Sequence, residues 1–447
     1  MEKGLKALGI CLQSIIRLFG ILWLSLLMAS SSAAAPNPPA LVAPVDNASS
    51  VSLSPTLSAG VSSPAGAPMA VKFYGRRAID PIFRIIVLPD TQNAAQFYPS
   101  VFTAQTQWIV NNKIALNIAF VAHVGDVVNT CTSTAQYNNA DAAMDLLDSG
   151  NVLYGVSPGN HDQPNSGSCG STSQYPNYFG TSRFSGKPYY GGRLDDYNHY
   201  FIFSAGGMDF IIVFLQYNPA TAQLDWVDAL LKANPRRRGI VVSHNILNID
   251  DSWSFPSIYE NLKDNSNLFL MLCGHMHSPT DGEALRTDTY NGNTVFSILS
   301  DYQDFPNGGS GWLRMLEIDP YAGQINVKAY SPYLGQTGTS FSLSYNMFQL
   351  LGTDAAVASG STASLTWPAP TLSALTEYEW YVTVNDATGT TTGPIWSFTT
   401  GTGTALVGDF APSDCDVDGS DLAALIGDFT LVELTDFAGN FGLSTCL

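Results

Sequence analysis

From about residue 82 onward, short apolar runs alternate with segments whose apolar residues recur every three or four positions. The first pattern predicts buried strands and the second predicts amphipathic helices. Strands that alternate with helices indicate a layered α/β core. We expect strands at 82–88, 117–124, 152–156, 210–215, 239–242, 268–273, 294–299, 313–318 and 324–329, helices at 101–112, 135–147 and 221–233, and long loops over 163–197.

The segments on either side of this core have a β pattern. Apolar and polar residues alternate with a period of about two at 363–367, 378–384 and 395–399. Shorter strand-like pieces occur at 55–61 and 70–74. Neither segment alone reaches the ~100 residues of a β-sandwich. One interpretation is a single immunoglobulin- or fibronectin type III-like sandwich, formed by 36–76 and 346–401, into which 77–345 is inserted. The rival interpretation is two separate small β-domains.

The first 35 residues have the pattern of a signal peptide. Lys3, Lys6 and Arg17 precede an apolar run at 18–29, and small residues follow it. The run is shorter than the ~20 residues that span a bilayer, which disfavours a membrane anchor. We therefore expect a secreted, periplasmic or cell-surface protein whose mature chain has no membrane span.

Charge and cysteine content fit an exported protein. The formal net charge is -18, which disfavours non-specific binding to nucleic acid. Export permits disulfides, and we expect the pairs Cys131–Cys169 and Cys415–Cys446, with Cys273 a buried strand thiol. Sequence alone does not fix the connectivity of these cysteines.

The C-terminal segment 402–447 is acidic and carries no Lys or Arg. Its carboxylates surround a glycine turn, an arrangement that suits calcium. The segment resembles a degenerate dockerin-like module of two helices that could bind calcium and a protein or cell-surface partner; a solvated acidic tail is the other interpretation. The candidate calcium ligands are Asp409, Asp414, Asp416, Asp418 and Asp421.

Five short polar motifs each follow a predicted strand of the α/β core. In open α/β sheets, sites form at the carboxyl ends of strands, so these motifs can converge on one crevice. Carboxylate, imidazole and amide groups together suit Mn, Fe or Zn better than calcium. The motifs are Asp90-Thr91-Gln92, Gly125-Asp126-Val127-Val128-Asn129, Gly159-Asn160-His161-Asp162, Ser243-His244 and Gly274-His275-Met276-His277.

The order of these motifs resembles the calcineurin-like metallophosphoesterase family, over roughly residues 82–335. The family pattern is D-x-H, G-D-x-x-[D/N], G-N-H-[D/E], a later H, and G-H-x-H. The resemblance implies a four-layer α/β/β/α sandwich and two divalent or trivalent metal ions that activate a hydroxide. The ligands that it implies are Asp90, Gln92 and His277 for the first ion, Asp126 as the bridge, and Asn160, His244 and His275 for the second ion.

The same resemblance assigns roles around the ions. His161 would contact the scissile phosphate and assist the leaving group, and Asp162 would orient its imidazole. Asn129 stands beside the bridging carboxylate. His123 is interpreted as packing behind the ligands. The motif-like stretch Asp301-Tyr302-Gln303 is a further candidate for lining the cleft.

Gln92 departs from the family pattern, because an amide oxygen is neutral and binds a metal ion more weakly than imidazole does. We interpret D-x-Q as the mark of a subfamily. The leading hypothesis is an exported dinuclear-metal phosphoesterase that hydrolyses phosphate mono- or diesters. The alternative is a non-catalytic surface binding or assembly protein whose β-sandwich and dockerin-like tail are the working parts.

Overall fold

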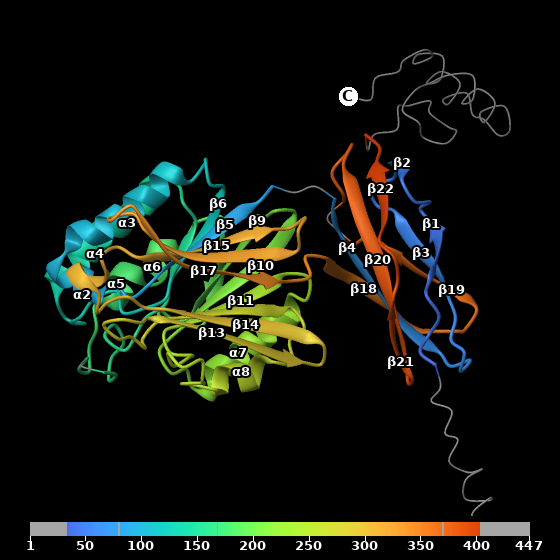
Figure 1. Cartoon of the computed structure of the whole chain (residues 1–447). Helices are drawn as coiled ribbons and strands as arrows, with labels where there is room; N and C mark the ends of the chain where they lie inside the picture. Colours follow the sequence, from blue (N-terminus) through green and yellow to red (C-terminus); the bar gives the residue numbers. More distant parts are fainter. Residues whose placement is uncertain (1–33, 79–80, 168, 369–370, 403–447) are drawn as a thin grey trace, which may run out of the picture. The chain divides into compact units, whose positions relative to one another are not determined.

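The computed structural model describes residues 34–78, 81–167, 169–368 and 371–402 (Figure 1). Within these ranges, residues up to 75 and from 350 form one compact unit, and residues 76–349 form a second. No helix in the described ranges is long and apolar enough to cross a membrane. The expected signal-peptide run, the candidate calcium ligands Asp409, Asp414, Asp416, Asp418 and Asp421, and the pair Cys415–Cys446 lie outside the described residues and stay predictions.

The second unit is built on two sheets. In the seven-stranded sheet the order is β13 (Glu283–Tyr290), β14 (Asn293–Ser300), β12 (Leu268–Cys273), β11 (Arg238–Ser243), β10 (Met208–Leu215), β9 (His199–Ala205) and β8 (Tyr190–Arg193). In the six-stranded sheet it is β17 (Gln336–Ser344), β16 (Gln324–Ser331), β15 (Leu313–Asp319), β5 (Phe83–Leu88), β6 (Ile118–His123) and β7 (Tyr154–Val156). The central strands are parallel: β5, β6 and β7 in one sheet, and β10, β11, β12 and β14 in the other.

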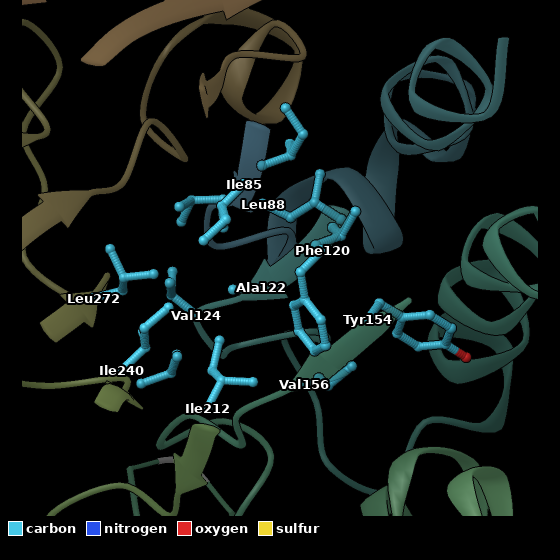
Figure 2. Close-up of a cluster of buried hydrophobic side chains, with 14 of the residues drawn as sticks. Ile85, Leu88, Phe120, Ala122, Val124, Tyr154, Val156, Ile212, Ile240 and Leu272 are labelled. Carbon is cyan, nitrogen blue, oxygen red and sulfur yellow. The ribbon is translucent and has the colours of Figure 1, made fainter. Parts of the chain in front are cut away.

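The two sheets pack face to face, and helices cover their outer faces, so the layers run helix, sheet, sheet, helix. Alternate residues of β10 separate two cores: Ile212 and Phe214 face the six-stranded sheet, whereas Ile211 and Val213 face α7 and α8. Figure 2 shows the inter-sheet core, where Phe120 is near Ile212. The helices are α2 (Gln92–Phe97), α3 (Pro99–Asn112), α4 (Thr134–Ser149), α5 (Tyr175–Phe179), α6 (Thr181–Phe184), α7 (Thr221–Ala233), α8 (Ser257–Leu262) and the short turn α9 (Pro306–Gly309).

The first unit is all β and is discontinuous in sequence. One sheet has the order β1 (Ala40–Ala43), β3 (Thr56–Val61) and β19 (Ser361–Thr366). The other has the order β18 (Gln349–Val357), β4 (Met69–Arg77), β20 (Glu377–Asp386), β22 (Trp396–Thr400) and β2 (Ala48–Val51), with β21 (Gly389–Thr392) paired to β20. Both sheets contribute to one core around Phe73 and Trp380. The likeness of this unit to fibronectin type III domains stays a prediction.

The predicted elements of the α/β core are all present, with ends that differ by no more than two residues. The expectation of long loops over 163–197 is partly wrong, because this segment contains α5, α6 and β8. It packs through aromatic side chains: Tyr175, Phe179 and Phe184 are fully buried in the same hydrophobic core as β5 and β6. The sequence did not indicate these short elements, because their aromatic residues do not recur with the period of a helix or of a strand.

A disulfide joins Cys131 to Cys169, as predicted, and Cys273 is a buried free thiol in β12, also as predicted. The bond closes a loop with a sequence separation of 38 residues. That loop contains α4, β7 and the Gly159–Asp162 motif, so the bond restrains the chain on both sides of the motif.

We expect the double variant Cys131→Ser/Cys169→Ser to lose about 4 kcal/mol of unfolding free energy, since the open loop regains conformational entropy in the unfolded chain. Urea denaturation of the two proteins measures the difference. The single variants Cys131→Ser and Cys169→Ser serve as controls and should show the same loss, since either one alone opens this loop. Equal urea midpoints for the two proteins would contradict the prediction.

Candidate metal centre

The five motifs lie at the carboxyl ends of the parallel strands, where the topology brings both sheets to one edge. The strand ends before the first two motifs lie side by side, because the Val124 N–H donates to the Leu88 carbonyl at 3.0 Å; Figure 2 labels both residues. The motif residues follow six strands: Asp90 and Gln92 follow β5, Asp126 follows β6, Asn160 to Asp162 follow β7, His244 follows β11, His275 and His277 follow β12, and Asp301 follows β14.

Asp126, His244 and His275 form a compact group whose candidate ligand atoms all lie within 4.8 Å of one another. His244 is completely buried, and its Nδ1–H donates to the backbone carbonyl of Val124 at 2.9 Å. Its Nε2 is 3.1 Å from Asp126 Oδ2. Two lone pairs at that distance would repel each other, so a shared cation or proton is needed between them. A metal ion bound by all three residues meets this need.

The electrostatics of the group agree with a cation. Burial opposes charging of His244, but the Asp126 carboxylate raises the pKa of its imidazole overall. Burial and then His244 lower the pKa of His275 to about 4, so its imidazole is neutral at pH 7 and can donate a lone pair to a metal ion. Burial likewise raises the pKa of Asp301 to about 6. Buried carboxylates close to one another are stabilised by a positive ion.

Two glycines of the motifs permit this close approach. Gly125 has φ of 109°, and a Cβ atom there would lie 2.7 Å from His244 Nδ1. A Cβ on Gly159 would lie 2.0 Å from Asp126 Oδ1. Asp126 itself has a left-handed φ of 49°. Its loop is therefore clamped between the β7 and β11 loops, and only glycine fits at both contact points.

The Asn160 side chain and the His161 backbone complete this side of the centre. Asn160 Oδ1 is buried without a hydrogen-bond partner among the described residues, which suits a fourth ligand. The backbone N–H of His161 donates to Asp126 Oδ1 at 2.8 Å, leaving Oδ2 directed at His244. The amide oxygen, the carboxylate and two imidazoles form a donor set typical of a borderline transition-metal ion.

The role that we expected for Asp162 is wrong in detail. The His161 ring is held through Nδ1, which is 2.7 Å from the backbone carbonyl of Asn129. Asp162 instead accepts backbone N–H groups: its Oδ2 accepts from Val127 and Gly159, both at 2.9 Å. A completely buried carboxylate is thus used to join two motif loops rather than to orient the imidazole.

His123 and Asn129 lie behind the centre. The Nδ1 of His123 accepts the Gly125 N–H at 3.1 Å, so its Nε2 carries the proton and donates to Thr91 Oγ1 at 2.9 Å. Both ring nitrogens are occupied, and burial lowers the pKa of His123 to about 3. It is a structural histidine. The Asn129 side chain donates to Gln96 Oε1 at 2.6 Å, which steadies the carbonyl that holds His161.

The three remaining predicted ligands are not arranged around a second ion. Gln92 Nε2 lies 3.2 Å from Asp90 Oδ2 and 3.4 Å from Asp126 Oδ2, where it acts as a hydrogen-bond donor. His277 is exposed, and its Nδ1 pairs with Asp304 Oδ2 at 2.7 Å. Among the described residues, the carboxylate and imidazole atoms that converge on one point are those of Asp126, His244 and His275, and the second ion that the sequence resemblance implied stays a prediction.

Sequence reasoning missed some residues near the centre. Tyr217 follows β10, and its hydroxyl is 3.4 Å from His275 Nε2. Its place after the predicted strand 210–215 could have indicated it. Asp301 is completely buried and its Oδ2 has no hydrogen-bond partner among the described residues; it belongs to the stretch that we considered only for lining the cleft. Asp304, the partner of His277, carried no sequence indication.

We expect Asp162→Asn to weaken metal binding by about 10–100-fold, the usual effect of removing a group that positions ligands. An amide can offer only one acceptor oxygen, so at least one of the contacts with Val127, Val128 and Gly159 is lost. Isothermal titration with Mn²⁺ measures the affinity. Asp225→Asn, on the exposed face of α7, is the matched control. Equal affinities in all three proteins would refute the positioning role.

Comparison with known proteins gives three findings. Residues 83–279 match the family model described as calcineurin-like phosphoesterase. The chain is 33% identical over 355 residues to YvnB, an uncharacterised protein of Bacillus subtilis strain 168, with 71% of this chain and 27% of that protein covered. The chain thus spans about a quarter of the length of this curated relative.

A solved structure, the sulfate thiohydrolase SoxB of Thermus thermophilus in complex with glycerol, is similar over 59% of this chain and 56% of that chain. The TM-score is 0.33 and the sequence identity is 11%. The family match covers all five motifs, and the last of them, Gly274 to His277, lies close to its C-terminal limit. Residues 83–279, within the unit 76–349, are thus similar to calcineurin-like phosphoesterases, in agreement with the order of the motifs.

Proposed function

We propose that the chain hydrolyses phosphate esters with a divalent transition-metal ion held by Asp126, His244 and His275. The convergence of these three side chains, with ligand atoms within 4.8 Å of one another, carries the proposal. A bound ion of this kind polarises a phosphoryl oxygen and acidifies water near neutral pH. The family match over 83–279 supports a metal-dependent hydrolase of phosphate esters.

The protein contributes a fixed, nearly dry site. Asp126 and His244 are almost completely buried, so their interaction with a bound cation would be weakly screened by solvent. The Asp126 loop is held by the Gly159 contact and by the His161 N–H, so its carboxylate cannot rotate freely. A site that is organised before substrate binds spends little energy on reorganisation during the reaction.

His161 supplies the proton in this proposal. Its Nδ1–H is held by the Asn129 carbonyl, so Nε2 is the atom that can exchange a proton with the substrate. The ring is partly exposed, unlike His123 and His244, which is what a group that meets substrate requires. Proton donation to the departing alkoxide completes the ester cleavage.

The direct test compares hydrolysis of a chromogenic phosphomonoester and diester by wild-type protein and by the Asp126→Ala and His275→Ala variants, with Mn²⁺, Fe²⁺ or Zn²⁺ supplied. We expect both variants to fall to the rate of the buffer. Asp225→Ala on the outer helix α7 is the control and should keep the wild-type rate. If wild-type and site variants hydrolyse at equal rates, the chain is not this enzyme, and the binding-protein hypothesis takes its place.

The role of His161 predicts a dependence on the leaving group. We expect His161→Gln to lower kcat by about 10²–10⁴-fold for an alkyl phosphate, whose alkoxide needs a proton. For a nitrophenyl phosphate, whose anion leaves without one, the loss should be much smaller. Rate measurements on both esters at one pH give the comparison. An equal loss on both esters would assign His161 to binding instead of proton transfer.

A further inference from the structure

Two Asp-x-Gln turns face each other beside the metal centre. Asp90-Thr91-Gln92 follows β5, and Asp301-Tyr302-Gln303 follows β14 in the other sheet. In each turn the aspartate Oδ1 accepts the backbone N–H of the glutamine two residues later, at 2.9 Å in the first turn and 3.0 Å in the second. Their side-chain amides meet, because Gln92 Nε2 donates to Gln303 Oε1.

The amide nitrogen of Gln92 lies between the two carboxylates that would share an ion. It is within hydrogen-bond distance of Asp90 Oδ2, Asp126 Oδ2 and Gln303 Oε1, all of which are acceptors. Nitrogen is the atom that fits there, since an amide oxygen would face the carboxylate oxygens of Asp90 and Asp126 without a donor. The cost is that Gln92 Oε1 is buried without a hydrogen-bond partner among the described residues.

Gln303 is itself held in place. Asn93 Nδ2 donates to its backbone carbonyl at 3.2 Å, and the Gln303 side chain is buried. Gly308 has φ of 66°, and a Cβ atom there would be 2.8 Å from the backbone nitrogen of Ala94. The loop after β14 therefore packs directly on the start of α2, which keeps the two amides together.

The imidazole that would complete the first position is directed elsewhere. His277 is exposed and pairs with Asp304, while both oxygens of Asp90 accept N–H groups of Gln92. The Gln92 residue thus donates hydrogen bonds to Asp90 and Asp126, two carboxylates that a second cation would otherwise bind. Asp301 Oδ2, on the same side, keeps no hydrogen-bond partner among the described residues.

We propose that the Gln92 amide takes the place of one of the two ions, so that the chain binds a single transition-metal ion, at Asp126, His244 and His275. This inference rests on the metal site of the proposed function and specifies its stoichiometry. It assigns a function to the D-x-Q sequence: the glutamine is an internal donor that excludes the neighbouring cation. Gln303 is the positioning residue that keeps this donor directed at the carboxylates.

The test is the number of ions and their magnetic coupling in full-length protein loaded with Mn²⁺. Excess Ca²⁺ keeps Mn²⁺ from the acidic segment 409–421. We expect one ion per chain by elemental analysis and the six-line spectrum of an isolated Mn²⁺ ion by electron paramagnetic resonance. Two ions at the ~3.5–4 Å of a dinuclear centre would give a coupled spectrum, which a distant ion cannot produce.

Gln92→Glu is the decisive variant, because it exchanges the amide nitrogen for an oxygen without changing the shape of the side chain. We expect the count to rise from one ion to two, with a coupled spectrum. Gln107→Glu makes the same chemical change on the exposed face of α3 and should leave the count at one. Gln92→His offers a second route to the same increase if the glutamate variant does not fold.

A coupled two-ion spectrum from wild-type protein would overturn the inference, as would a count of one in folded Gln92→Glu. The outcome is independent of the proposed function. Wild-type protein that hydrolyses esters with two coupled ions would retain the function and refute the inference. Wild-type protein that binds one ion and hydrolyses no ester would support the inference and refute the proposed function.

Discussion

The carboxylate of Asp126 is the point at which the loops of the α/β unit meet. Its Oδ1 accepts the His161 N–H from the β7 loop, and its Oδ2 faces His244 from the β11 loop. Its backbone carbonyl accepts the N–H of Thr91 from the β5 loop at 3.2 Å. One residue thus connects three strand ends in two sheets, and the geometry of the metal centre depends on how closely those ends approach it. The glycines at 125 and 159 set that approach, because a side chain at either position would displace the loop.

Burial of several carboxylates around one point is the second constraint. Asp90, Asp126, Asp162 and Asp301 are each at most 2% exposed. Burial raises the pKa of Asp162 to about 7, with the Asp126 charge adding to the effect, and it raises the pKa of Asp90 for a similar reason. In Asp126, by contrast, His244 outweighs burial and lowers the pKa. The negative charge is concentrated where the imidazoles are, and Gln92 supplies neutral hydrogen-bond donors to Asp90 and Asp126.

Much of this arrangement follows from the sequence. The strands β5, β6, β11 and β12 are mostly apolar on both faces, so their continuous apolar runs predicted them from the sequence. Because these strands are parallel within each sheet, the motifs that follow them lie at one edge. The edge strand β13 has a polar sequence and gave no such pattern. Sequence spacing also fixes which loop a side chain belongs to but not its rotamer. The outward turn of His277 and the use of Asp162 by backbone N–H groups depend on contacts with Asp304 and Val127, which only the folded chain brings together.

The discontinuous β unit has a consequence for the order of events during synthesis. Ser58 in β3 hydrogen-bonds to Ser364 in β19, and the two residues are 306 positions apart in the chain. At about 5–20 residues per second, the ribosome needs roughly 15–60 s to make the second strand after the first. Residues 76–349 are complete before that, and their own strands pair within the segment. β1 and β3 can pair with each other early, but β2, β4 and the second edge of β3 wait for strands that begin at residue 349 or later. These edges therefore need protection from other chains for longer than the strand edges of 76–349 do.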